Sequence, residues 1–83
     1  MKDKNINELI EAFLQAKNSE NALDLLKGLL TSKELDEVAR RLQIVKMLKA
    51  GVSQRDIVEK LKVGIATVTK GSKEIAKGRF KSI

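Results

Sequence analysis

Residues 53–74 contain the feature that most constrains the fold, namely two helical segments separated by a tight corner. Ser53 has the pattern of an N-cap for a two-turn helix, and the corner is the sequence Lys-Val-Gly at residues 62–64. Two helices joined this closely cross at a steep angle, so their inward positions must be apolar. The inward set is Ile57, Leu61, Val63, Val68 and Ile75. The pattern predicts a helix-turn-helix over residues 53–77.

The outer face of the second helix, predicted from residue 65 to 77, begins with small side chains and becomes basic. Ala66, Thr69, Lys70, Lys73 and Lys77 share this face at helical spacing, and Thr67 lies beside it. Small side chains let a backbone approach base edges, and lysines reach phosphates. Threonine and valine also lower helix propensity, so helix stability alone does not explain them. The face indicates DNA reading, and a solvated lysine-rich helix is the alternative.

Three amphipathic helices are predicted before this unit. The first begins at an Asn5 N-cap and ends near residue 17, the second begins at a Ser19 N-cap, and the third spans residues 32–50. A capping box between Thr31 and Glu34 precedes the third helix, and Gly51 ends it. The apolar stripes of the first two helices exceed what one small monomer needs. We therefore expect residues 5–50 to form a homodimer interface, with an ordinary core as the alternative.

The chain is short and basic, with 83 residues and a net charge of +6. Such a length makes one domain, residues 1–83, with a core that is marginal alone. Residues 31–83 carry thirteen Lys or Arg against six acids, which suggests a polyanion partner, with a soluble lysine-rich surface as an alternative that charge alone supports equally. Only two aromatic residues are present, which argues against a stacking platform for single strands. The basic tail, residues 79–83, is predicted to be flexible.

Several other classes of function lack the residues they need. The sequence contains no His or Cys, so we expect no metal site and no disulfide, and an enzyme is not predicted. Charges interrupt every apolar run, so no membrane partner is expected and a cytoplasmic location follows. The alternative to a DNA-binding protein is a helical protein–protein interaction module that uses the leucine-rich first two helices.

The motif GIATVTKGS at residues 64–72 resembles the reading helix of the tryptophan repressor family. The similarity extends upstream over residues 29–72, through Ser53-Gln54-Arg55, Leu30-Thr31, Glu34, Arg41 and Ile44-Val45. The resemblance implies an all-α, five-helix, intertwined homodimer. Its two helix-turn-helix heads would enter successive major grooves of a palindromic operator, about 34 Å apart, and act in transcription regulation as a repressor.

The resemblance also implies which side chains contact DNA. Gln54 and Arg55 would approach from the first helix of the unit, with Arg55 the candidate for a guanine. Ile65 would touch a base edge, although from the residues alone it fits a core position equally well. The complete expected DNA-binding set is Gln54, Arg55, Ile65, Ala66, Thr67, Thr69, Lys70 and Lys73.

The family's corepressor is L-tryptophan, and the resemblance implies a ligand site. Its residues would be Thr31, Arg41, Lys70, Gly71 and Glu74, with the Arg41 fork gripping a carboxylate. Lys70, Glu74 and Gly28 replace a stacking arginine, a serine and a leucine of the family. Glu74 could bind an ammonium group or pair with Lys70. A family member with no cofactor or ligand is therefore the alternative to one that binds tryptophan or a related amino acid.

Two further departures lie near the corner. One residue is missing between Gly51 and Ser53, and Lys62 stands where the family has glycine. If this position requires a positive φ, lysine costs about 1 kcal/mol of backbone strain. The chain is similar to a shorter branch of the family, because it stops just past Gly78.

Overall fold

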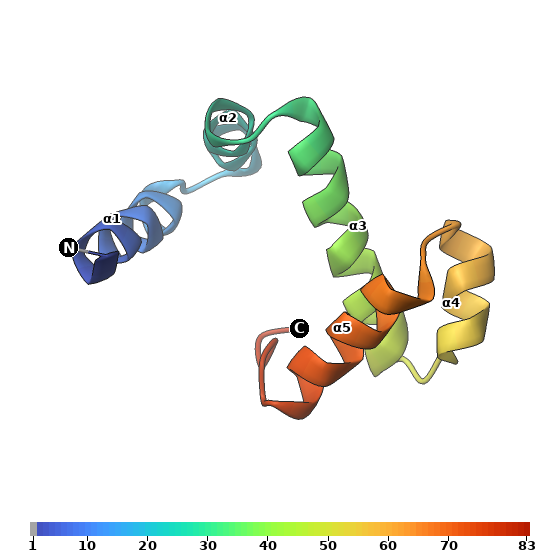
Figure 1. Ribbon diagram of the computed structural model, residues 1–83. Helices are drawn as coiled ribbons and strands as arrows, with labels where there is room; N and C mark the ends of the chain where they lie inside the picture. Colours follow the sequence, from blue (N-terminus) through green and yellow to red (C-terminus); the bar gives the residue numbers. More distant parts are fainter. Residues whose placement is uncertain (1) are drawn as a thin grey trace. The chain divides into compact units, whose positions relative to one another are not determined.

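The computed structural model describes residues 2–83, and this part of the chain is all-α with no strand (Figure 1). The predicted all-helical class and five-helix order are confirmed. The helices are α1 (Lys2–Gln15), α2 (Ser19–Leu29), α3 (Ser32–Lys49), α4 (Gln54–Leu61) and α5 (Ile65–Ala76). None of these helices is long and apolar enough to cross a membrane.

By their internal contacts the residues divide into two units, 1–35 and 36–83, with the division in the first turn of α3. In the first unit, α1 and α2 carry the predicted apolar stripes, yet no residue from 3 to 35 is buried. Leu14 is 70% exposed and Leu29 is 56% exposed. The other exposed large apolar side chains of this unit are Ile6, Leu9, Ile10, Phe13 and Leu23.

The starts of α1 and α2 differ from the prediction. Asn5 lies inside α1, which begins at Lys2, so Asn5 is not its N-cap. Asn18 rather than Ser19 caps α2, because the Oδ1 atom of Asn18 accepts a hydrogen bond of 2.8 Å from the amide of Asn21. Asn and Ser are about equally good N-caps, so the sequence pattern did not separate these neighbours.

The capping box before α3 is confirmed. The Thr31 hydroxyl accepts from the Glu34 amide at 3.1 Å, and the Glu34 carboxylate accepts from the Thr31 amide at 2.9 Å. The hydrogen bond that the Thr31 amide donates to the carboxylate is the main reason that the pKa of Glu34 lies below its usual 4.5. Two amide groups that lack a partner inside the helix are thereby satisfied.

The second unit has a small buried core, made by one side chain from each of its three helices. Ile44 of α3, Ile57 of α4 and Val68 of α5 are at most 1% exposed and form one cluster, and Val45 of α3 is also buried. The predicted inward positions 57 and 68 are therefore buried, and Leu61 and Val63 pack against the core. Burial of each such side chain contributes about 1.5–3 kcal/mol, so this unit contains the main source of folding free energy in the described chain.

Gly71 of α5 lies against side chains of α3. A Cβ atom at Gly71 would lie 3.4 Å from Cγ2 of Ile44 and 3.5 Å from Cδ1 of Leu48. These are ordinary van der Waals distances, so alanine would fit here, whereas a longer side chain would meet Ile44 and Leu48. The structure gives Gly71 a packing role at this crossing.

At the corner between α4 and α5, the backbone of Lys62 has a positive φ. Lys62 has φ 56° and ψ 44°, the left-handed conformation, and its amide donates to the Val58 carbonyl at 3.0 Å. Lysine in this conformation costs about 1–2 kcal/mol relative to a right-handed one. The condition raised by the sequence, a positive φ at residue 62, is therefore met.

The chain after α5 folds back toward the end of α3. Gly78 has φ 93° and directly follows Lys77, the C-cap of α5. The Lys49 ammonium donates to the carbonyl of Phe80 and, at 3.2 Å, to that of Ile83. The flexibility of residues 79–83 stays a prediction.

Candidate nucleic-acid interface

Local capping and the corner together orient α4 and α5. The Ser53 hydroxyl accepts from the Asp56 amide at 3.1 Å, which fixes the start of α4 as predicted. Gly64 precedes α5 in an extended conformation and has no side-chain cap, so the first turn of α5 keeps free backbone N–H groups. With Val68 buried, the opposite side of α5 faces outward.

The predicted DNA-binding side chains are accessible on this surface. Ile65 is 55% exposed, which resolves its two interpretations in favour of a surface position. Gln54 and Thr69 are half-buried. The other exposed members of the set are Arg55, Ala66, Thr67, Lys70 and Lys73.

A hydrogen bond joins the two helices at their outer edge. The Thr69 hydroxyl donates to Oε1 of Gln54 at 3.1 Å, and both side chains are half-buried there. The amide nitrogen of Gln54 is left as a donor for an outside partner. Sequence reasoning assigned both residues to DNA separately and missed this contact, because the residues are fifteen positions apart and no periodicity connects them.

The outer face of α5 forms a shallow hollow of about 420 Å³. It is lined by Ala66, Thr69, Lys70, Lys73, Glu74 and Lys77. The structure thus gathers the small and basic residues that the helical spacing placed on one face. This arrangement suits double-stranded DNA, because small side chains allow the helix to approach base edges and basic side chains contact phosphates.

Glu74 is held by basic neighbours that follow it in the chain. Its carboxylate lies 3.0 Å from the ammonium of Lys77 and 3.7 Å from Nε of Arg79. The hydrogen bond from Lys77 is the main reason that the pKa of Glu74 lies below its usual 4.5. Within residues 2–83 the ion pairs are those two, so the alternative pairing of Glu74 with Lys70 is not formed.

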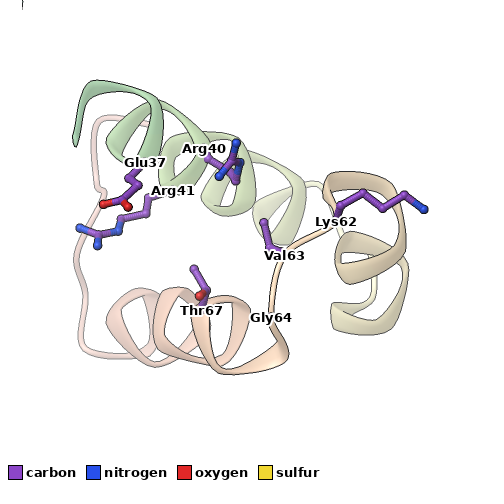
Figure 2. A pocket seen from close by; sticks show the side chains of 7 residues that line it. All are labelled: Glu37, Arg40, Arg41, Lys62, Val63, Gly64 and Thr67. Carbon is purple, nitrogen blue, oxygen red and sulfur yellow. The ribbon is translucent and has the colours of Figure 1, made fainter. Parts of the chain in front are cut away.

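A second cavity, of about 320 Å³, lies beside the start of α5 (Figure 2). Figure 2 shows Glu37, Arg40 and Arg41 on α3, with Val63 and Thr67 directed toward the space between α3 and α5. The cavity is lined by Glu37, Arg40, Arg41, Lys62, Val63, Gly64 and Thr67. Sequence reasoning did not assign Glu37, Arg40 or Lys62 to a site. The sequence had assigned Arg41 and Thr67 to contacts of their own, and the strain expected at Lys62 was the signal that pointed to the corner.

The structure distributes the expected ligand residues over several places. Arg41 lines the cavity at the start of α5, whereas Lys70 and Glu74 line the hollow on its outer face. Gly71 packs against α3, and Thr31 belongs to the first unit, where its hydroxyl and amide are used in the capping box. Arg41 and Glu74 therefore line different cavities within residues 36–83.

The chain is similar to known proteins over almost its full length. A family model described as Trp repressor protein matches residues 4–81. A Trp operon repressor homolog of Vibrio parahaemolyticus is 36% identical over 69 residues, which cover 82% of this chain and 67% of that protein. The corresponding homolog of Vibrio campbellii is 34% identical over 73 residues, which cover 87% of this chain and 73% of that protein.

The similarity is not restricted to one genus. A Trp operon repressor homolog of Pasteurella multocida is 42% identical over 71 residues, covering 84% of this chain and 66% of that protein. No solved structure matches the chain significantly. The resemblance first seen in the motif at residues 64–72 is confirmed by the match over residues 4–81, and this protein belongs to the Trp repressor family.

Proposed function

We propose that the protein is a homodimeric transcriptional repressor that binds a palindromic operator through the major groove of double-stranded DNA. Its family is one of DNA-binding transcriptional regulators, and its relatives are named as repressor homologs. The observation that carries the proposal is the outward face of α5, where small residues precede basic ones over a shallow hollow. This face supports α5 as the reading helix.

The roles of the DNA-binding residues follow from their positions. Ala66 and Thr69 lie where base edges would approach α5, and Ile65 offers an exposed apolar contact to a thymine methyl. Arg55, exposed at the start of α4, is the candidate for bidentate binding to guanine. The exposed Thr67, Lys70 and Lys73 would contact phosphates. The half-buried Gln54 would donate through its free amide nitrogen.

A second copy of the chain would cover the apolar stripes of α1 and α2. Seven large apolar side chains of this unit, from Ile6 to Leu29, are at least 38% exposed in the single chain. A large exposed apolar surface marks an interaction site. Two copies would also provide the two heads that a palindromic operator requires. Light scattering that finds a monomer would instead favour a module that binds another protein through these helices.

We further propose that the repressor works without tryptophan. Lys70 lacks the planar group that would stack on an indole ring. Glu74 is occupied by Lys77 and Arg79, and it lines a different cavity from Arg41. These features support a DNA head whose affinity does not depend on an aromatic amino acid.

The test is selection of bound sites from a random duplex pool, with and without L-tryptophan. We expect an enriched palindrome whose half-sites lie about 10 base pairs apart, and the same palindrome and affinity under both conditions. Log affinity should fall linearly with log salt concentration. A pool that shows no enrichment would contradict sequence-specific binding, and enrichment only with tryptophan would contradict ligand independence.

A further inference from the structure

Lys62 combines a strained backbone with a charge that forms no ion pair within residues 2–83. Its φ of 56° places it in the left-handed region, which glycine adopts without steric cost and lysine does not. The two ion pairs within residues 2–83 both involve Glu74, so Lys62 gains no ion pair in return for this strain. Backbone strain of this kind is concentrated at functional sites.

The neighbours of Lys62 make the cavity beside it positive. Arg40, Arg41 and Lys62 are all exposed and line the same cavity, opposed by the single carboxylate of Glu37. In Figure 2 the carboxylate of Glu37 lies on the side of Arg41, while Arg40 and Lys62 extend separately from α3 and from the corner. The excess of positive charge suits an anion.

The remaining lining is polar and small. Val63 is the one apolar side chain among the residues that line the cavity, so there is little surface for an aromatic ring. The Thr67 side chain points toward the cavity and offers a hydroxyl donor (Figure 2). Arginine forks and a hydroxyl are suitable partners for the oxygens of a phosphate group.

We propose that the cavity formed by Arg40, Arg41, Lys62 and Thr67 binds a backbone phosphate of the DNA, and that Lys62 occupies the strained corner for this contact. The inference rests on the proposed function, because it takes the duplex to lie along α5. Thr67 follows Ala66 directly in the chain. A DNA strand that places a base edge at Ala66 would therefore place its phosphates near the N-terminal end of α5. The cavity therefore extends the DNA-binding surface from α5 onto α3.

The variant Lys62→Gly separates folding from binding. Because glycine relieves the strain, the variant should have a higher Tm than the parent protein. Because one phosphate contact is lost, its affinity for the selected duplex should fall about tenfold at moderate salt. The slope of log affinity against log salt should become smaller by about 1 per dimer half-site. Fluorescence anisotropy over a series of salt concentrations measures both quantities.

Matched variants control for the loss of charge. Lys62→Arg keeps the charge and should keep the salt slope, whereas Lys17→Gln removes a lysine from the exposed segment between α1 and α2 and should leave the slope unchanged. Arg40→Gln should lower the slope as Lys62→Gly does. Glu37→Gln removes the opposing carboxylate and should raise the affinity severalfold.

Neutral methylphosphonate linkages, introduced one at a time into the selected duplex, locate the phosphate. At one position in each half-site, the linkage should weaken binding of the parent protein but add little further loss for Lys62→Gly. An unchanged salt slope in Lys62→Gly, or equal losses for parent and variant at every position, would overturn the inference while leaving the reading role of α5 intact. A parent protein that does not bind duplex DNA would overturn the proposed function itself.

Discussion

The two units of the chain use apolar residues in opposite ways. Residues 36–83 bury Ile44, Ile57 and Val68 among three helices, whereas no described residue from 3 to 35 is buried. Both regions have amphipathic helices, yet only the second buries apolar side chains of those helices within one chain. The comparison teaches that residues 36–83, which carry α4 and α5, contain their own core, whereas the apolar stripes of α1 and α2 stay exposed in the single chain and are the surface that the proposed dimer would cover.

The largest effect is expected in the core of the second unit. Ile57→Ala removes a fully buried side chain and should lower the free energy of unfolding by about 2–5 kcal/mol. Because the core lies within one chain, the loss should be the same at low and high protein concentration. Urea denaturation followed by circular dichroism at two concentrations measures it. A loss that changes with concentration would show that the second unit also depends on a partner.

The next largest effect is expected on α1. Ile10 is 50% exposed in the single chain, and Ile10→Glu would place a charge in the proposed dimer interface. We expect the dissociation constant of the dimer to increase about 100-fold, which corresponds to a loss of about 2.7 kcal/mol in the free energy of association. Sedimentation or light scattering over a dilution series measures the change.

Gln15→Glu is the matched control for that experiment. It adds the same charge at the exposed end of α1, outside the apolar stripe, and should leave the dimer intact. If both variants remain dimeric, α1 is not the partner surface and the contrast between the two units loses its explanation.

A smaller effect separates reading from folding within the second unit. Thr69→Val removes the hydroxyl that donates to Gln54 and leaves that amide without its orienting partner. Affinity for the selected duplex should fall about tenfold, while binding to random duplex stays the same. Anisotropy with both duplexes measures the ratio.

Lys73→Gln provides the contrast to Thr69→Val. The exposed Lys73 side chain would contact phosphate, so its removal should weaken both duplexes alike. If Thr69→Val also weakens both duplexes alike, the Gln54–Thr69 contact has no part in specificity.

The smallest effect concerns pH and the capping box. Hydrogen bonds from Thr31 lower the pKa of Glu34 in the folded protein, so ionised Glu34 stabilises folding above its unfolded pKa. That stabilisation should be lost as pH falls from 4.5 through the lowered folded pKa. Thermal denaturation should show a steeper acid loss of Tm in the parent than in Glu34→Gln, and parallel curves would contradict a contribution from this cap.

Local patterns were sufficient for the helices and the corner. Helical spacing located all five helices, and the pattern of Thr31 and Glu34 identified a capping box that the hydrogen bonds confirm. The same reasoning erred at Asn5 and Ser19, since several neighbouring polar residues can cap a helix. It also left Ile65 undecided between core and surface, because an apolar residue at the first position of a helix satisfies either.

The sequence by itself determined the class of fold, the helical boundaries to within a few residues, the outward face of α5 and the family. These features depend on spacing along one helix or on a contiguous motif, which the chain carries locally. Only the tertiary structure decided that Thr69 orients Gln54, that Gly71 lies against α3, and that Arg40 and Lys62 share a cavity. Each of these contacts joins different helices, so it exists only after packing has set the crossing of α3, α4 and α5.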